Sequence, residues 1–243
     1  MEKRLPAAAS HARTGSPARE AASAFRPHDL LWAQDWHGLL AHVALPSWVV
    51  EARHAGDPVI AVVRREALND PALVAVGLRG RERSQRLGVR LQRAAVLHCV
   101  SPEMLIDFAA PGRPSDPAAS RAISALGRIA PLLDASGLFW GPTGSLGYAL
   151  ATGLPALHSA SDIDLLVRAP FPLSARQAQL LHAALASSAC LVDMQIDTGH
   201  GGFSFAEWNR GGSVLLKTDF GPFLTSDPWN RTSRADAVAS KAP

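Results

Sequence analysis

The stretch GSLGYALATGLPALHSASDIDLLV, Gly144 to Val167, opens with a Gly-Ser pair and closes on two aspartates within an apolar segment. Side chains of a β-strand alternate between its two faces, so Asp162 and Asp164 share one face and the apolar residues share the other. The two carboxylates then lie about 7 Å apart along the strand. Two like charges that close are unfavourable unless a cation lies between them or one is protonated. The pattern predicts a metal ion or an arginine partner.

Helices and strands are expected on both sides of this segment. Asp116 is a candidate N-cap with Pro117 in the first turn, and the helical period that follows ends at Gly137. The sequence LFW, 138–140, reads as a short strand that leads into the Gly-Ser turn. After the aspartates, Ser174 and Gln177 form the S-x-x-Q pattern of a capping box at the start of another helix.

A third acid follows in the predicted strand ACLVDMQID, 189–197. Strand alternation places Cys190, Val192, Met194 and Ile196 inward and Asp193, Gln195 and Asp197 on the opposite face. Asp193 is therefore a candidate to join Asp162 and Asp164 in one site.

The sequence before this region predicts a smaller, β-rich N-terminal domain over 25–109. Trp48–Ala52 and Val59–Arg64 read as the two strands of a hairpin around Gly56-Asp57-Pro58. The polar stretch AAPGRPSDP, 109–117, is typical of a linker, so a second, catalytic domain is expected over 110–232. Residues 1–24 and 233–243 are expected to be disordered tails.

Composition bounds the class of protein. The chain is 47% hydrophobic, which is ample for a core, and its net charge of +3 is too small to demand a nucleic-acid partner. Cys99 and Cys190 show no metal-binding spacing, and no apolar run approaches the ~18 residues that span a bilayer. The N-terminus lacks the apolar core of a secretion signal. We expect a cytoplasmic protein with neither a nucleic-acid nor a membrane partner.

The order of these elements resembles the nucleotidyltransferase superfamily with the polymerase-β-like fold. The motif is an apolar residue, Gly-Ser, a spacer, an acid-x-acid strand and a later third acid; here the spacer is longer than usual. The fold class implied is α/β (α+β), with a mixed sheet in the catalytic domain. Gly144 would let the backbone approach phosphate oxygens, and Ser145 would add a hydroxyl and an N–H at a helix start. The acids Asp162, Asp164 and Asp193 suit Mg²⁺ or Mn²⁺.

A closer resemblance covers about residues 25–230. The segments PHDLLW, GLRG-x-x-R-x-Q-R, TGLPALHSASDIDLL, VDMQIDTGHGGFSFAEW and GPFLTSDPW look like the malonate decarboxylase holo-acyl-carrier-protein synthases, also called phosphoribosyl-dephospho-CoA transferases. The resemblance implies transfer of 2′-(5″-phosphoribosyl)-3′-dephospho-CoA from its triphosphoribosyl donor to a serine of the apo acyl-carrier subunit, with release of pyrophosphate. The two essential acids of the family fall on Asp162 and Asp164.

Other residues are candidates for substrate binding. GLRGRERSQRLGVRLQR is arginine-rich, and it reads either as a solvated surface or as a surface for phosphate or an acidic protein. Within it, Arg79 and Arg83 flank the small Gly80 and are the first choices. Lys217 is a candidate for the triphosphate or a solvated strand end, and His200 is a candidate at the rim of the site or a structural residue.

Two other functions fit the same residues. One is a nucleotidyltransferase acting on another small molecule or on RNA with the same acids. The other is an adaptor whose catalytic domain has lost activity, against which the three intact acids argue. Label on a carrier-protein serine would distinguish the carrier-modifying enzyme from both.

Overall fold

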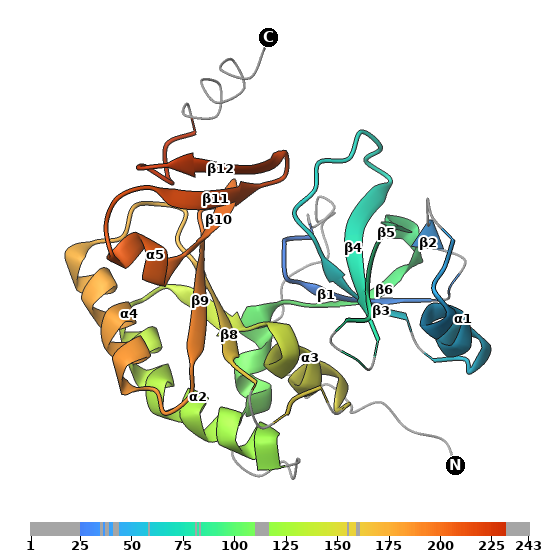
Figure 1. Ribbon diagram of the computed structural model, residues 1–243, viewed down its shortest axis with the longest axis horizontal. Coiled ribbons are helices and arrows are strands. Elements are labelled where there is room, and N and C mark those ends of the chain that lie inside the picture. Colours follow the sequence, from blue (N-terminus) through green and yellow to red (C-terminus); the bar gives the residue numbers. More distant parts are fainter. Residues whose placement is uncertain are drawn as a thin grey trace, which may run out of the picture.

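The computed structural model describes residues 25–231, with gaps at 35, 37–38, 41–43, 58, 81, 83, 110–116, 155 and 159–160. Two sheets lie side by side, joined through the 3-10 helix η3 (Pro102–Ala109) (Figure 1). The predicted tails, 1–24 and 233–243, lie outside the described residues, as do most of the predicted linker, Asp116 and the candidate Arg83.

The first sheet has six antiparallel strands in the order β2-β5-β4-β3-β1-β6. The longest pairing is the hairpin of β4 and β5, whose register joins Arg79 to Arg86 at the end next to the turn. The predicted β-rich N-terminal region is therefore confirmed. The strands are β1 (Leu30–Ala33), β2 (Leu39–Leu40), β3 (Val59–Val63), β4 (Leu73–Arg79), β5 (Arg86–Gln92) and β6 (Val96–Val100), with the 3-10 turn η2 (Arg93–Ala95) before β6.

One predicted strand of this region is wrong. The segment Trp48–Ala52 lies in the helix α1 (Ser47–His54), so it forms no hairpin with β3. Only Val49 in this helix is fully buried, which is the one-sided burial of a surface helix and not the alternation of a strand. Arg53 and His54 lie in the last turn, where positive charge interacts favourably with the helix dipole.

The second sheet is mixed and has the order β12-β11-β10-β9-β8-β7, with β8 and β9 parallel and the other pairs antiparallel. Helices α2 and α4 cover one face, and α3 lies toward the first sheet (Figure 1). The elements are α2 (Pro117–Ala135), β7 (Phe139–Pro142), α3 (Gly144–Thr152), β8 (Ile163–Arg168), α4 (Ala175–Ser187), β9 (Val192–Asp197), β10 (Gly201–Ser204), α5 (Phe205–Asn209), β11 (Val214–Thr218) and β12 (Gly221–Thr225).

Local sequence signals explain this half of the molecule. The capping box at α4 is confirmed, because Ser174 accepts from the backbone N–H of Gln177 and the Gln177 side chain accepts from the backbone N–H of Ser174.

The predicted α+β class with a mixed sheet is likewise confirmed. No helix among the described residues is both long and apolar enough to cross a bilayer.

The two sheets share one hydrophobic core. Leu30, Ile60 and Val100 of the first sheet belong to the same buried cluster as Leu165 and Val167 of β8. A second cluster, centred on Leu31 and Leu91, occupies the other face of the first sheet. The face of the first sheet that carries Leu30, Ile60 and Val100 therefore packs toward the second sheet. Residues on this face can reach the carboxylates of the second sheet.

Candidate active site

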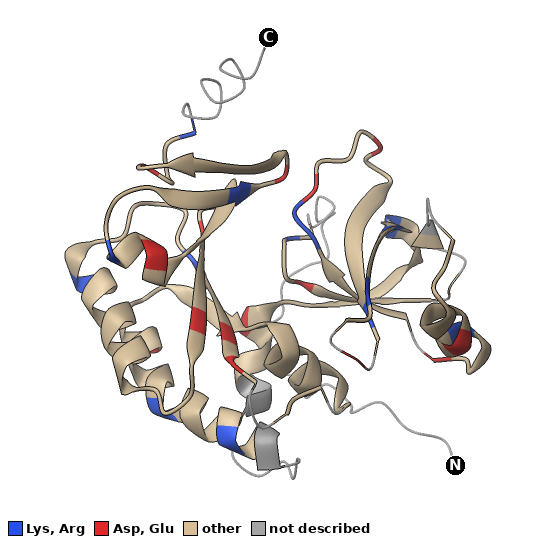
Figure 2. Cartoon of the chain, in the orientation of Figure 1, with Lys and Arg blue, Asp and Glu red and all other residues tan. Residues whose placement is uncertain are grey.

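The three predicted acids lie at the same end of the β8–β9 pair, and two of them are direct neighbours across the strands. Asp164 and Asp193 are directly paired in the parallel register, and strands so paired lie about 4.8 Å apart. Asp162 immediately precedes β8 and is exposed, as is Asp193, whereas Asp164 is half-buried. Figure 2 shows the acidic segments of the two strands side by side. The pairing follows from a parallel alignment that no single-strand pattern reveals.

The Gly-Ser turn packs directly against Asp164. Thr143 donates its backbone N–H to the Asp164 carbonyl over 2.8 Å, and Gly144 then begins α3 with a φ of +57°. A Cβ on Gly144 would overlap the Asp164 Oδ2. The backbone N–H of Ser145 donates to the Asp164 carboxylate. Gly144 is therefore required twice, by its left-handed conformation and by the closeness of the carboxylate.

The electrostatics of this end favour a bound cation. Burial raises the pKa of Asp164, and the charges of Asp193 and Asp162 raise it further, against the opposing effects of Arg86 and the Ser145 N–H. A divalent ion would relieve the repulsion among these hard oxygen donors, so they fit Mg²⁺ chemically. Within the described part of the chain, no three His, Cys, Asp or Glu side chains are already gathered closely enough to hold a metal ion.

Arg79 reaches this site from the first sheet. Its Nη1 donates to the Ser145 Oγ over 3.0 Å and its Nη2 donates to the Ala156 carbonyl over 3.1 Å. The guanidinium lies 5.7 Å from the ring centroid of Tyr148, one turn along α3. Burial lowers the pKa of Arg79, and the neighbouring charge of Arg86 adds to that effect. The hairpin thus contacts the Gly-Ser turn, the next turn of α3 and the loop after α3.

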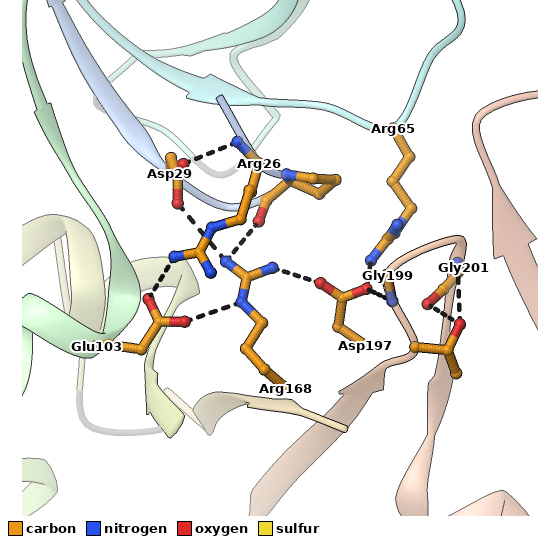
Figure 3. A network of polar contacts seen from close by, with 10 residues as sticks. Arg26, Asp29, Arg65, Glu103, Arg168, Asp197, Gly199 and Gly201 are labelled. Carbon is orange, nitrogen blue, oxygen red and sulfur yellow. Dashed lines mark hydrogen bonds and ion pairs between the residues drawn. The ribbon is translucent and has the colours of Figure 1, made fainter. Parts of the chain in front are cut away.

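A buried ion network occupies the other end of the same two strands (Figure 3). Arg168 lies four residues after Asp164, about 13 Å along β8, and pairs with Asp197 of β9. Its Nε also donates to Glu103 over 2.9 Å, and its Nη2 donates to the Pro27 carbonyl over 3.3 Å. Since Pro27 precedes β1 and Glu103 lies in η3, Arg168 connects both sheets with the segment that joins them.

The network continues into the first sheet. Arg65, which follows β3, pairs with Asp197 over 2.6 Å, and Arg26 pairs with Glu103 over 3.2 Å. Burial alone would raise the pKa of Asp197, but the Arg65 charge, the Gly199 N–H and Arg168 together hold it below its ordinary value. The carboxylate is therefore ionised at neutral pH and clamped between the two sheets.

The remaining candidates lie elsewhere. His200 lies beyond the opposite end of β9, where its Nδ1 is 3.1 Å from the Thr198 hydroxyl. Lys217 is exposed on β11, where it lies opposite Gly202 of β10. Gly202 in turn lies opposite Asp197, at the end of β9 away from Asp193. The structure does not bring either residue to the carboxylates.

Sequence reasoning also missed two neighbours of the site. Tyr148 is the only tyrosine in the chain, and its position one helical turn after Gly144 could have indicated that it lies beside the Gly-Ser turn. Arg86 belongs to the arginine-rich segment. Because it pairs directly with Arg79 in the β4–β5 hairpin, its side chain lies on the same face of the sheet as that of Arg79.

Comparisons with known proteins cover both halves of the chain. Residues 26–102 match the phosphoribosyl-dephospho-CoA transferase MdcG N-terminal domain, and residues 110–228 match the MdcG C-terminal domain. A phosphoribosyl-dephospho-CoA transferase of Pseudomonas putida strain W619 is 46% identical over 86% of this chain and 97% of its own length. The phosphoribosyl-dephospho-CoA transferase of Klebsiella pneumoniae strain 342 is 43% identical over 85% of this chain and 97% of its own length.

No solved structure matches the chain. The resemblance inferred from the sequence motifs is nevertheless confirmed, since both domain families and near-full-length relatives agree. The protein therefore belongs to the phosphoribosyl-dephospho-CoA transferase family.

Proposed function

We propose that the protein transfers 2′-(5″-phosphoribosyl)-3′-dephospho-CoA from its triphosphoribosyl donor to a serine of the apo acyl-carrier subunit of malonate decarboxylase. The observation that carries the proposal is the direct pairing of Asp164 with Asp193 against the Gly144-Ser145 turn. Family membership supports the transferred group, because the relatives are named for it.

The reaction exchanges a phosphoanhydride bond of the donor for a phosphodiester bond to the carrier serine. The carrier serine Oγ attacks the α-phosphorus of the donor triphosphate, the bond from that phosphorus to the pyrophosphate oxygen breaks, and pyrophosphate leaves. The serine proton passes to a carboxylate, for which the exposed Asp193 is our candidate. We expect the Ser145 hydroxyl, in the first turn of α3, to donate to a phosphate oxygen of the donor.

We propose that Asp162, Asp164 and Asp193 hold Mg²⁺ or Mn²⁺. When bound, the ion would neutralise charge on the reacting phosphate oxygens. The raised pKa of Asp164 supports this assignment, since a cation beside it would offset both neighbouring carboxylates. The protein residues themselves orient the phosphates and receive the serine proton.

The test uses labelled donor and purified apo carrier subunit, with and without chelator. We expect label on a carrier serine, loss of labelling in chelator and its return with Mg²⁺ or Mn²⁺. Asp164→Asn should lower turnover about 100-fold or more, as loss of a preorganised electrostatic group does. Asp219→Asn, an exposed carboxylate in the β11–β12 turn, is the matched control and should keep full turnover.

Stability provides a second measurement on the same variants. Because the folded state raises the pKa of Asp164, ionising this group disfavours folding above its ordinary pKa. Asp164→Asn should therefore melt at the same temperature as the parent or higher at pH 7. Inactivity caused by misfolding would instead lower the melting temperature.

The other two functions predict different outcomes. A nucleotidyltransferase for another acceptor would leave the carrier unlabelled while consuming a nucleoside triphosphate in a screen of small molecules and RNA. An inactive adaptor would give no metal-dependent turnover with any donor. Carrier labelling that persists in excess chelator would contradict the metal assignment alone.

A further inference from the structure

The first sheet contributes a side chain to the phosphate-binding turn of the second. Arg79 is the last residue of β4, and its two terminal nitrogens donate to the Ser145 Oγ and to the Ala156 carbonyl. These bonds join the turn before α3 to the loop after it. A planar guanidinium suits this arrangement, because its donors are fixed in one fork.

The neighbours of Arg79 hold it in that position. Tyr148 lies under the guanidinium from α3, and Arg86 stands opposite Arg79 in the hairpin. The charge of Asp164 interacts favourably with Arg79, and both terminal nitrogens of Arg79 already donate to protein oxygens. Arg79 is therefore better placed to orient Ser145 than to give up that bond and bind a ligand itself.

We propose that Arg79 is a positioning residue, through which the N-terminal sheet fixes the Ser145 hydroxyl for the polyphosphate of the donor. Its guanidinium leaves the Ser145 hydroxyl proton free, since Arg79 donates to the oxygen and the hydroxyl can then donate to a phosphate oxygen. The N-terminal half is thus part of the active site. The identity of the polyphosphate rests on the proposed function.

The test is a double-mutant cycle on pyrophosphate binding, measured by calorimetry on the full chain with Mg²⁺. We expect Arg79→Gln and Ser145→Ala each to weaken pyrophosphate binding about 10-fold, the amount that one oriented hydrogen bond to a charged group contributes. The double variant should be no weaker than Ser145→Ala, because Arg79 acts through Ser145. Arg90→Gln, four residues beyond Arg86 on β5, is the matched arginine control and should bind as the parent does.

Kinetics and a conservative variant separate positioning from a purely structural role. Arg79→Gln should raise the KM for the donor and leave the KM for the carrier unchanged. Arg79→Lys keeps the charge but cannot make both bonds, so it should restore binding only in part. A structural role predicts a lower melting temperature with unchanged pyrophosphate affinity.

Each outcome decides the proposal. Additive losses of about 100-fold in the double variant would overturn it, since they would mean independent contacts. Absence of pyrophosphate binding to the parent chain, or equal effects of Arg79→Gln and Arg90→Gln, would overturn it as well. The titration needs no carrier protein, so failure to label the carrier would contradict only the proposed function.

Discussion

At the scale of single residues, two glycines at the ends of α3 have the same backbone conformation and different surroundings. Gly144 and Gly153 have φ values of +57° and +70°. A Cβ on Gly144 would overlap Asp164, whereas a Cβ on Gly153 would meet nothing within 4 Å. The pair therefore separates backbone strain from crowding of the Asp164 carboxylate.

Gly153→Ala should cost about 1–2 kcal/mol of unfolding free energy, the strain of a left-handed alanine, and leave turnover unchanged. Gly144→Ala should cost more and reduce turnover about 100-fold, because Asp164 must move aside. Urea denaturation and carrier labelling of both variants measure the two effects. Equal losses of turnover would show that the closeness of Asp164 is not what requires glycine at position 144.

At the scale of elements, α4 separates structural from catalytic contributions. It packs with α2 on the face of the second sheet away from the first sheet, and its capping box is complete (Figure 1). Leu181 and Ala184 on its inner face are fully buried. The helix therefore stabilises the sheet without contacting the carboxylates.

Ser174→Ala should lower the unfolding free energy by about 1 kcal/mol, because the N-cap bond to Gln177 is lost. Turnover at 25 °C should not change. Ser187→Ala at the end of the same helix is the matched control, since the Ser187 hydroxyl only donates back to backbone carbonyls of its own helix, those of Ala183 and Ala184. Its cost should stay within about 0.5 kcal/mol. If Ser174→Ala impaired turnover in the folded protein, the separation of α4 from the site would be wrong.

At the scale of the whole molecule, the ion network and the candidate acids Asp164 and Asp193 occupy the same face of β8 and β9. Strand alternation places Asp164 and Arg168 on one face of β8, and Asp193 and Asp197 on the matching face of β9. The clamp of Arg65, Arg168 and Asp197 therefore joins the two sheets at the end of β8 and β9 opposite Asp164 and Asp193. Removing Arg168 would leave Asp197 with Arg65 alone and Glu103 with Arg26 alone, and losing one partner of a buried ion pair typically costs about 3–5 kcal/mol.

A half-buried histidine, His28, makes this interface sensitive to acid. Burial, together with the charges of Arg65 and Arg168, lowers the pKa of His28 from 6.5 to about 4, against the opposing effects of Asp197 and Gln195. Between these values the unfolded chain binds more protons than the folded one, so the free energy of unfolding rises with pH. Its contribution is complete above pH 6.5 and is lost as the pH falls to about 4.

His28→Asn tests this contribution, since asparagine tolerates the φ of +76° at that position. The parent should lose up to about 3 kcal/mol between pH 7 and pH 4 through this group, and His28→Asn should lose correspondingly less. Chemical denaturation at both pH values provides the measurement. Parallel pH curves for the two proteins would show that His28 does not titrate as its surroundings imply.

Local patterns in the chain were sufficient for much of the second sheet. Strand alternation placed the acids of β8 and β9 on one face of the sheet, and the Ser174–Gln177 capping box marked the start of α4. Trp48–Ala52 was misassigned because a short, Val-rich run satisfies both helix and strand patterns, and only burial on one side decides between them.

The amino-acid sequence by itself determined the periodicities, the Gly-Ser turn, the acids and, through its motifs, the family. Only the tertiary structure decided that Asp193 pairs with Asp164, that Arg79 reaches Ser145 from the other sheet, and that Lys217 and His200 lie away from both. The reason is physical. Periodicity reports which face of an element is buried, whereas strand order and the packing of two sheets bring together residues distant in the chain, and these depend on the combined burial of both halves.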